Sequence, residues 1–328
     1  MIRFANTLAL LITGLCAATI GFAQTRDAAS YPVKPVRIVV GFVPGGGADI
    51  AGRILAQQLT EAFGRSFVVE NRPGASATIA TEYVARSAPD GYTLLVGIPT
   101  AHSILPALSR RLNYDVLRDF VPVAMIAISP QLLAVHPSLP VRSVGDLIKL
   151  AKARPGHLSF GAGGIGTPPH MAGELFKQMA GVDMLFVPYQ GEAPAIADII
   201  GGQISLIFST MSAVLPQVRA GRLRGIAVTS EQRIATASEF PTVAESGLPG
   251  FAVESWYGLL APAGTPGDIV ARINNETGRM LDQQELRDRL TTQGLFVRTS
   301  TPEQLAAYMR SEIAKWAKVV KESGLKID

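Results

Sequence analysis

Residues 37–49 read R-I-V-V-G-F-V-P-G-G-G-A-D, and this stretch decides the fold. Its first seven residues form a nearly unbroken apolar run, which is typical of a strand buried on both faces of a parallel sheet. After the three glycines, Ile50, Ile54 and Leu55 recur at helical spacing. The stretch therefore predicts a strand, a glycine-rich turn and a helix, which together make the first βα unit of an α/β protein.

This pattern of strand, turn and helix occurs twice along the chain. In the first series, strands are predicted at 67–69 and 93–97, with a helix at 77–86 between them. Strand-like stretches at 121–127 and 131–135 lead to a second series. Its elements are a strand at 158–160, a glycine-rich turn at 161–169, a helix at 171–179, a strand at 184–187, a helix at 193–200, and strands at 206–209 and 224–229. Repeated βα units predict parallel sheets with right-handed crossovers.

The C-terminal part cannot form a core alone, so we expect it to pack back on the first series. It holds a strand at 256–261, a helix around Ile273, a short strand at 295–297 and a terminal helix that begins near Ser300. The chain would then cross between the halves near Ile128 and again between Thr229 and Trp256. The prediction is an α/β fold of two hinged lobes, with residues 31–128 and 235–328 in lobe 1 and residues 129–234 in lobe 2. Ligands of open α/β sheets bind at the carboxyl ends of strands, so the site should lie in the cleft between the lobes.

Composition supports a folded protein that does not bind nucleic acid. Of the 328 residues, 48% are hydrophobic and 17% are charged, which excludes a disordered chain. The net charge is only +4. The basic residues are scattered along the sequence, so no basic stripe of the kind that binds nucleic acid is expected.

Residues 1–23 have the pattern of a secretory signal peptide. Arg3 supplies the positive start, residues 8–20 are almost wholly apolar, and small residues at 21 and 23 predict cleavage between Ala23 and Gln24. A membrane anchor is the alternative, but the apolar run is shorter than the ~20 residues that a spanning helix needs. The only cysteine, Cys16, lies in this segment. We therefore expect a periplasmic protein whose mature chain has no disulfide.

The two glycine-rich turns carry most of the chemical information. Each follows the first strand of its series and opens a helix, so unpaired backbone N–H groups and the positive end of a helix dipole point toward the predicted cleft. Such ends attract carboxylate or phosphate, and glycines let a ligand oxygen approach the main chain. Two turns in equivalent places favour an anion clamp over two merely tight turns. Asp49 would repel an anion, and we interpret it as a residue that bonds the backbone and fixes its loop.

Other catalytic and cofactor patterns are weak. Residues 161–166 satisfy G-x-G-x-x-G, but the next strand ends in V-P-Y-Q without the acidic residue that a dinucleotide ribose needs. The four histidines have no metal-ligand spacing, so neither a metal nor a cofactor is expected. His102 and His170 each follow a strand that should face the cleft. For each of them, ligand contact and helix capping stay open.

Nine blocks of this sequence resemble the Bug-type solute-binding receptors of tripartite tricarboxylate transporters. The resemblance runs in unbroken order from about Tyr31 to the C-terminus. The blocks are V-V-G-F-V-P-G-G-G-A-D-I-A-G-R (39–53), V-E-N-R-P-G (69–74), P-D-G-Y-T-L-L (89–95), D-F-V-P-V (119–123), residues 161–170, V-P-Y-Q-G (187–191), G-G-Q (201–203), P-T-V-A-E-S-G (241–247) and G-L-L-A-P-A-G-T-P (258–266). Gly41 and Ser246 depart from the commonest residues of the family, and neither belongs to the expected anion contacts.

The resemblance implies a type II periplasmic binding protein fold and delivery of a di-, tri- or aromatic carboxylate to a membrane permease. It implies that two loops hold one carboxylate of the ligand through backbone N–H groups, partly through water. These loops are Pro44, Gly45, Gly46, Gly47, Ala48 and Asp49, and Gly163, Gly164, Ile165, Gly166 and Thr167. It further implies that Thr100, His102, Tyr189, Ser209 and Met211 line the rest of the cleft and set specificity.

The leading hypothesis is therefore a monomeric binding protein without catalysis. One alternative is a ligand sensor that feeds a membrane signalling protein. Another is a secreted hydrolase or isomerase with His102 or His170 as base, although no activated nucleophile accompanies them in the sequence. No arginine is placed in the cleft by the sequence, and Arg72 is only a candidate near its rim. The identity of the carboxylate stays open.

Overall fold

The computed structural model describes residues 30–109 and 112–323. The signal peptide expected at 1–23 and its cleavage point lie outside these residues. Within the two described ranges, no helix is long and apolar enough to cross a membrane.

The first sheet region contains the predicted parallel strands. Its order is β2 (Phe67–Asn71), β1 (Val36–Val40), β3 (Thr93–Gly97), β9 (Glu254–Pro262) and the first part of β4 (Phe120–Val135). β1 pairs in parallel with β2 and β3, whereas β9 is antiparallel to both β3 and β4. The short strand β10 (Phe296–Val297) also pairs with β4. The C-terminal elements thus complete the sheet that the N-terminal elements begin.

β4 differs from the prediction because it is one strand of 16 residues rather than two. The register shifts after Pro122, and β9 begins opposite Pro130. Proline cannot donate to a ladder, and a bulge or the end of a partner strand accommodates it. From Gln131 on, β4 pairs with the second sheet region instead. A single strand therefore links the two regions.

The second sheet region repeats the parallel arrangement. It contains β7 (Leu206–Thr210), β5 (Ser159–Ala162), β6 (Leu185–Pro188) and β8 (Arg224–Val228). β5 pairs in parallel with β6 and β7, and β7 and β8 pair antiparallel with β4. Phe160 and Phe208, on neighbouring strands, are fully buried in its core.

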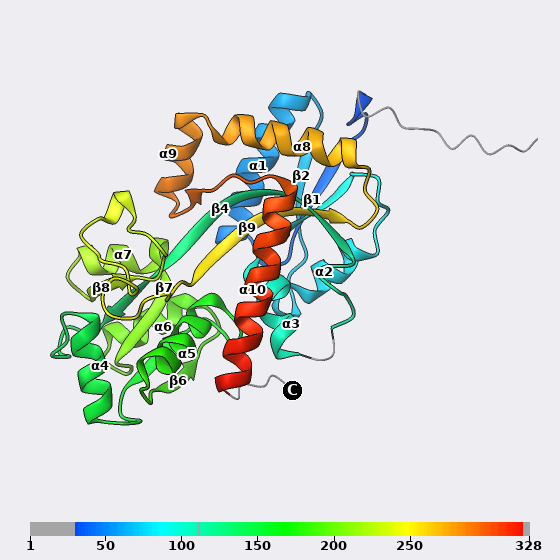
Figure 1. Ribbon diagram of the computed structural model, residues 1–328. Coiled ribbons are helices and arrows are strands. Elements are labelled where there is room, and N and C mark those ends of the chain that lie inside the picture. Colours follow the sequence, from blue (N-terminus) through cyan, green and yellow to red (C-terminus); the bar gives the residue numbers. More distant parts are fainter. Residues whose placement is uncertain (1–29, 110–111, 324–328) are drawn as a thin grey trace, which may run out of the picture. The chain divides into compact units, whose positions relative to one another are not determined.

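Helices follow the strands along the chain and cover the sheet (Figure 1). Those of the first region are α1 (Gly47–Phe63), η2 (Ala75–Ala77), α2 (Thr78–Ala85), η3 (Thr100–Ile104), α3 (Leu105–Leu108), α8 (Gly267–Leu281) and α9 (Gln284–Thr292). Those of the second are α4 (Val144–Ala153), α5 (Pro168–Ala180), α6 (Glu192–Ile200), α7 (Met211–Arg219) and η4 (Ala235–Ala237). The sequence did not single out α4, α7 or α9.

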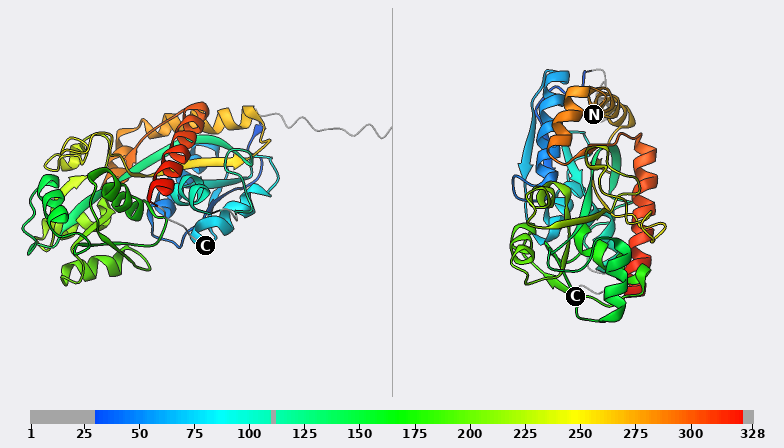
Figure 2. Two further views of the ribbon diagram at one scale, coloured as in Figure 1. Left: turned by 60° about the horizontal axis from the view of Figure 1, so that its bottom comes forward. Right: turned by 90° about the vertical axis from the view of Figure 1, so that its left-hand side faces the viewer.

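The terminal helix α10 (Pro302–Ser323) packs on both regions (Figures 1 and 2). Leu305 and Met309 belong to the core that contains Leu95 and Trp256 of the first region. About two to four turns further on, Trp316 and Val319 belong to the core of the second region. The helix therefore joins the two cores along its length.

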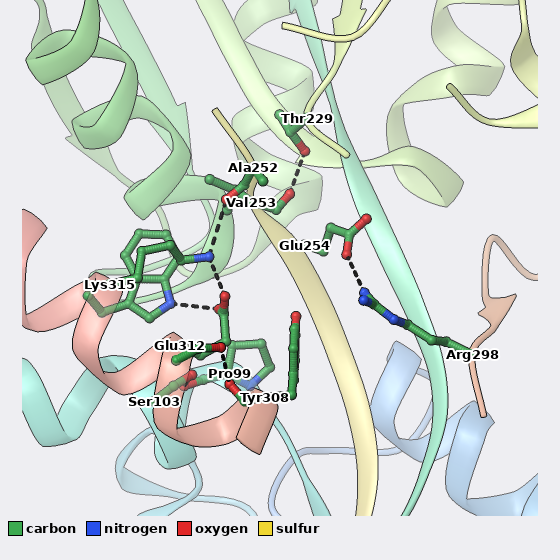
Figure 3. Close-up of polar contacts among 12 residues, drawn as sticks. Pro99, Ser103, Thr229, Ala252, Val253, Glu254, Arg298, Tyr308, Glu312 and Lys315 are labelled. Atoms are coloured by element: carbon green, nitrogen blue, oxygen red, sulfur yellow. Dashed lines mark hydrogen bonds and ion pairs between the residues drawn. The ribbon is translucent and has the colours of Figure 1, made fainter. Parts of the chain in front are cut away.

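Polar contacts hold residues 252–254, which lead into β9, next to α10 (Figure 3). Lys315 Nζ donates to the carbonyl of Ala252 at 3.2 Å, and the Thr229 hydroxyl donates to the carbonyl of Val253 at 2.6 Å. At the start of the strand, Arg298 forms an ion pair of 3.3 Å with Glu254. Burial raises the pKa of the Glu254 carboxyl, and the positive charge of Arg298 offsets part of that rise. These contacts hold the second connection between the regions in place.

Candidate functional site

A cavity of about 230 Å³ lies at the carboxyl ends of β1, β3, β5, β6 and β7. Both sheet regions contribute to it. Its lining residues are Phe42, Gly46, Gly47, Ala48, Ile98, Pro99, Thr100, Gly163, Thr167, Pro168, Pro169, Gly191, Glu192, Thr210, Ser255 and Tyr257. This is the edge at which open α/β sheets bind ligands. Its volume lies below the roughly 300–1,000 Å³ of pockets for drug-sized ligands, so it suits a smaller molecule.

The first glycine-rich loop brings a helix N-terminus to the cavity wall. Gly46 is the N-cap of α1, and Gly46, Gly47 and Ala48 all line the cavity. The first backbone bond of the helix runs from the N–H of Ile50 to the carbonyl of Gly46. The N–H groups of residues 46–49 therefore precede the helical ladder, which leaves up to four donors and the positive end of a helix of 17 residues at this wall.

Asp49 holds this loop in shape. Its carboxylate is almost fully buried and accepts hydrogen bonds of 2.9 Å from the Gly45 N–H, from Arg53 Nε and from Asn71 Nδ2. Burial raises the pKa of Asp49, but these hydrogen bonds outweigh burial and keep the pKa below its ordinary value. The carboxylate is thus ionised near neutral pH, and its bonds face the loop rather than the cavity. This is the loop-fixing role that the sequence indicates for Asp49.

The second glycine-rich loop supplies fewer donors. Thr167 is the N-cap of α5, and the first two helical residues are Pro168 and Pro169, which have no N–H. The Met171 N–H already bonds to the carbonyl of Thr167. Only the N–H groups of Thr167 and His170 are therefore left where the first loop has up to four. Both prolines line the cavity, so this wall is more apolar than the wall of the first loop.

The two histidines act as loop caps in this structure. The Gly166 N–H donates to His170 Nδ1 at 3.1 Å, and the Ile98 N–H lies 3.1 Å from His102 Nδ1. In both loops, as at Gly45 and Asp49, the donor precedes the capping side chain by four residues. Both rings are buried, and neither lines the cavity. Burial lowers the pKa of each histidine to about 4, with a smaller contribution from Lys177 at His170, so both are neutral near pH 7.

Glu192 is a cavity residue that the sequence did not single out. It is the first residue of α6, and its Oε1 accepts a hydrogen bond of 3.0 Å from the Thr210 N–H. Its Oε2 accepts one of 2.5 Å from the Thr210 hydroxyl. Burial raises the pKa of this carboxyl, and the bonds from Thr210 offset part of that rise. An acidic residue directly after V-P-Y-Q-G, at the start of a helix that follows a strand, is the signal that could have found it.

Tyr257 connects the two walls. A methyl group in place of the Gly47 hydrogen would collide with the Tyr257 hydroxyl, so this hydroxyl lies directly against the first loop. Burial and the negative charge of Glu192 both raise the pKa of Tyr257, so the phenol stays protonated. On the other side, a Cβ atom at Gly163 would lie 2.8 Å from the Gly191 carbonyl carbon and 2.9 Å from the Glu192 nitrogen. Glycine at 47 and at 163 is therefore required by close approach.

The structure brings part of the predicted set to the cavity. Gly46, Gly47, Ala48, Thr100, Gly163 and Thr167 line it. The other predicted residues lie outside its wall: Pro44, Gly45, Asp49, His102, Gly164, Ile165, Gly166, His170, Tyr189, Ser209 and Met211. Ile165 is instead 48% exposed, so its side chain faces away from the core.

The outlying residues have other partners. The Tyr189 hydroxyl donates to Asp198 at 2.7 Å, and burial together with that contact raises the pKa of Tyr189 to about 12. Met211 is buried in the apolar core formed with Val214 and Ile207. Arg72, a candidate for the rim, stacks 3.6 Å from the ring centre of Tyr83 and bonds to Glu70. These contacts explain why none of the three reaches the cavity.

Two larger hollows lie elsewhere. One of about 860 Å³ is bordered by Lys34, Arg37 and Tyr83, and one of about 510 Å³ by α7 and residues 291–296. Neither collects the strand ends and helix N-termini that meet at the smaller cavity. Among the described residues, no three histidine, cysteine, aspartate or glutamate side chains are grouped so that they could hold a metal ion.

Comparison with known proteins gives a consistent assignment. The sequence model of the tripartite tricarboxylate transporter family receptors matches residues 51–325. The chain is 36% identical to the protein BugT of Bordetella pertussis over 323 residues, which cover 97% of this chain and 98% of BugT. Similarity thus extends over nearly the whole of both proteins.

Solved structures agree with this assignment. The structure of R. palustris Rpa4515 with adipate superposes with a TM-score of 0.81 at 39% identity and covers 90% of this chain and 99% of that one. MatC from Rhodopseudomonas palustris with bound malate has a TM-score of 0.76 at 33% identity. The match covers 88% of this chain and 100% of that one. The α/β fold of two-lobed periplasmic binding proteins, predicted from the sequence, is confirmed.

Proposed function

Because the chain belongs to the tripartite tricarboxylate transporter receptor family, we propose that it captures a small organic carboxylate in the cavity at the strand ends. The observation that carries this proposal is the N-terminus of α1, whose unpaired N–H groups line a cavity to which the described residues bring no lysine or arginine side chain. Backbone donors and a helix dipole bind carboxylates well. The relatives Rpa4515 and MatC hold adipate and malate, which supports the same ligand class here.

In this proposal the protein binds its ligand and does not catalyse a reaction. A hydrolase or isomerase would need His102 or His170 as base, and both rings are buried outside the cavity with Nδ1 engaged by a backbone group. A general base must reach the proton that it abstracts, directly or through one water. The arrangement of these histidines therefore supports a receptor rather than an enzyme.

The receptor would act in the periplasm as a monomer and deliver its ligand to a membrane permease. In this proposal residues 31–128 and 235–328 form one lobe and residues 129–234 the other, and ligand binding favours the closed arrangement because the cavity wall comes from both. α10 packs on both cores, so it would constrain how far the lobes separate.

A thermal-shift screen tests the proposal. The purified protein is screened against mono-, di- and tricarboxylates, amino acids and aromatic acids, each paired with its amide. A ligand at 100 times its Kd adds about 2.7 kcal/mol to the free energy of unfolding. At roughly 2–4 °C per kcal/mol, the Tm should rise by several degrees. A rise with an acid and none with its amide supports the proposal. If no acid shifts the Tm, after co-purified ligand has been removed and ruled out, the carboxylate assignment is wrong.

A further inference from the structure

Glu192 is the feature of the cavity that carboxylate binding alone does not explain. Among the described residues that line the cavity, it is the only one with a charged side chain. Bringing a carboxylate to a site for carboxylates costs binding energy, because like charges repel at close range. The residue therefore needs a ligand group that compensates for it.

The Glu192 carboxyl is held in a fixed position with acceptor capacity left over. Each of its oxygens accepts one hydrogen bond from Thr210, and the Ser209 hydroxyl is also near enough to lower the pKa of the carboxyl. A carboxylate offers about four acceptor positions, so about one stays available. No ion pair with lysine or arginine involves Glu192 within residues 30–109 and 112–323, and a partly buried carboxylate without a cation is costly. The unused position can thus gain from a donor on the ligand.

On the cavity side, Glu192 has an acceptor rather than a donor beside it, because the Ser209 hydroxyl, which also contacts Glu192, does not line the cavity. The Thr210 hydroxyl donates its hydrogen to Glu192, so its oxygen can only accept a hydrogen bond from a ligand. The first loop has the opposite character, because the N–H groups of Gly47 and Ala48 and the protonated Tyr257 hydroxyl lie together there. The cavity is therefore polarised, with donors on the wall of α1 and acceptors on the wall of α6 and β7.

We propose that Glu192 makes the cavity selective for carboxylates that also carry a hydrogen-bond donor, either a hydroxyl or an ammonium group. This inference rests on the proposed function, since the ligand carboxylate must occupy the α1 wall. The donor then faces Glu192 and Thr210. An acid that could only place a second, ionised carboxylate there is rejected by the Glu192 charge.

Matched acids test this selectivity on the purified protein by calorimetric titration at pH 7.5. Butanoate, 2- and 3-hydroxybutanoate and 2-aminobutanoate share one skeleton, as do succinate, malate and aspartate, and adipate serves as a longer acid without a donor. A hydrogen bond to a charged group is worth roughly a tenfold change in Kd or more. The best hydroxy or amino acid of a skeleton should therefore bind at least about tenfold more tightly than its parent acid. Whichever of the two, the hydroxy acid or the amino acid, gains more affinity over the parent acid identifies the donor.

Glu192→Gln removes the charge while nearly preserving the shape of the side chain. In this variant the preference for the donor-bearing acid should fall to less than about threefold, and succinate and adipate should bind more tightly than to the unchanged protein. Glu276→Gln is the matched control, because Glu276 lies on α8, pairs with Arg279 and does not line the cavity. It removes one negative charge and should leave every Kd unchanged.

The outcomes separate this inference from the proposed function. Acids that bind the unchanged protein without regard to the donor overturn the inference and leave the proposed function standing. Tighter binding of adipate or succinate than of malate or aspartate also overturns it, as does an undiminished donor preference in Glu192→Gln. If no acid binds, the proposed function fails and this inference fails with it. The ranking with the unchanged protein decides the matter even if Glu192→Gln folds poorly.

Discussion

The two glycine-rich loops are alike in sequence and placement but differ in what they offer a ligand. Both follow the first strand of a parallel series, both open a helix, and in both a side chain accepts a hydrogen bond from the N–H four residues earlier. The cap is the ionised Asp49 in one loop and the neutral His170 in the other. The first loop leaves up to four helix donors, whereas Pro168 and Pro169 remove two from the second. The number of available N–H groups, rather than of glycines, should therefore decide which loop holds the anion.

The charged cap should matter most to stability. Asp49→Ala leaves the Gly45 N–H without its acceptor and removes one of the two hydrogen bonds of the Asn71 amide, which keeps its bond to the Phe42 carbonyl. It also removes the ion pair with Arg53, which is itself half exposed. We expect a loss of about 3 kcal/mol in the free energy of unfolding by urea denaturation. His170→Ala removes one neutral hydrogen bond and a ring contact with Phe186, and should cost about 2 kcal/mol. An equal or larger loss for His170→Ala would contradict this ranking.

The close approach of the second loop to α6 should matter next. In Gly163→Ala the new methyl group meets the backbone of Gly191 and Glu192, which cannot move aside as a side chain end can. Overpacking of this kind costs roughly 2 kcal/mol, and displacement of Glu192 should also abolish measurable ligand binding. Gly46→Ala is the matched control, because no heavy atom lies within 4 Å of its Cβ position and its φ is −83°. If both variants unfold at the same urea concentration, the close approach is not needed.

Acid should loosen the two loops in different pH windows. The pKa of His170 is about 4, below its ordinary value of 6.5, so its stabilisation is complete above pH 6.5 and is lost as pH falls from there through 4. In that window the unfolded chain binds a proton that the folded protein excludes. The pKa of Asp49 lies below 3.8, so its contribution is lost only at lower pH.

His170→Asn keeps an acceptor but cannot titrate, so it separates the two windows. We expect it to reduce the loss of unfolding free energy between pH 6.5 and 4 by up to about 3 kcal/mol. His136→Asn is the matched histidine control, because His136 lies beside Ser205 at the start of β7, away from His170. Parallel pH profiles for His170→Asn and the unchanged protein would rule out His170 as the source of the acid sensitivity.

Returning a donor to the second loop should have the smallest effect. Pro169→Ala restores an N–H at the start of α5, on the cavity wall. A carboxylate should then bind a few-fold more tightly, since one added bond contributes below about 1 kcal/mol after solvent exchange. Pro302→Ala makes the same change at the start of α10, away from the cavity, and should not alter binding. Weaker binding to Pro169→Ala would show that the apolar wall itself is needed.

The parts of the fold that depend on local patterning were predictable. The apolar run before Pro44 and the helical spacing after Gly47 place β1 and α1, and the repeat after residue 158 places β5 and α5. β4 was split in the prediction because Pro130 reads as the end of a strand. Only the partner strands show that the ladder passes from one sheet region to the other at this residue.

The site was predictable where backbone forms it and less so where side chains do. The glycine loops follow from sequence, but the sequence could not decide between ligand contact and capping for His102 and His170. Each ring lies against a backbone N–H four residues earlier, that of Ile98 for His102 and that of Gly166 for His170, and this contact is visible only in the loop geometry. Glu192 was missed because its orientation depends on Thr210, which lies 18 residues later at the end of β7.

Amide chemical shifts test most directly whether the first loop holds the carboxylate. A ¹⁵N-labelled sample is titrated with an acid that raises the Tm, and the amide resonances of both loops are followed. We predict large shifts for Gly47 and Ala48 and smaller ones for Thr167 and His170, with no comparable change when the amide of that acid is added. Larger shifts in the second loop, or binding of the acid with Gly47 and Ala48 unmoved, would contradict the account.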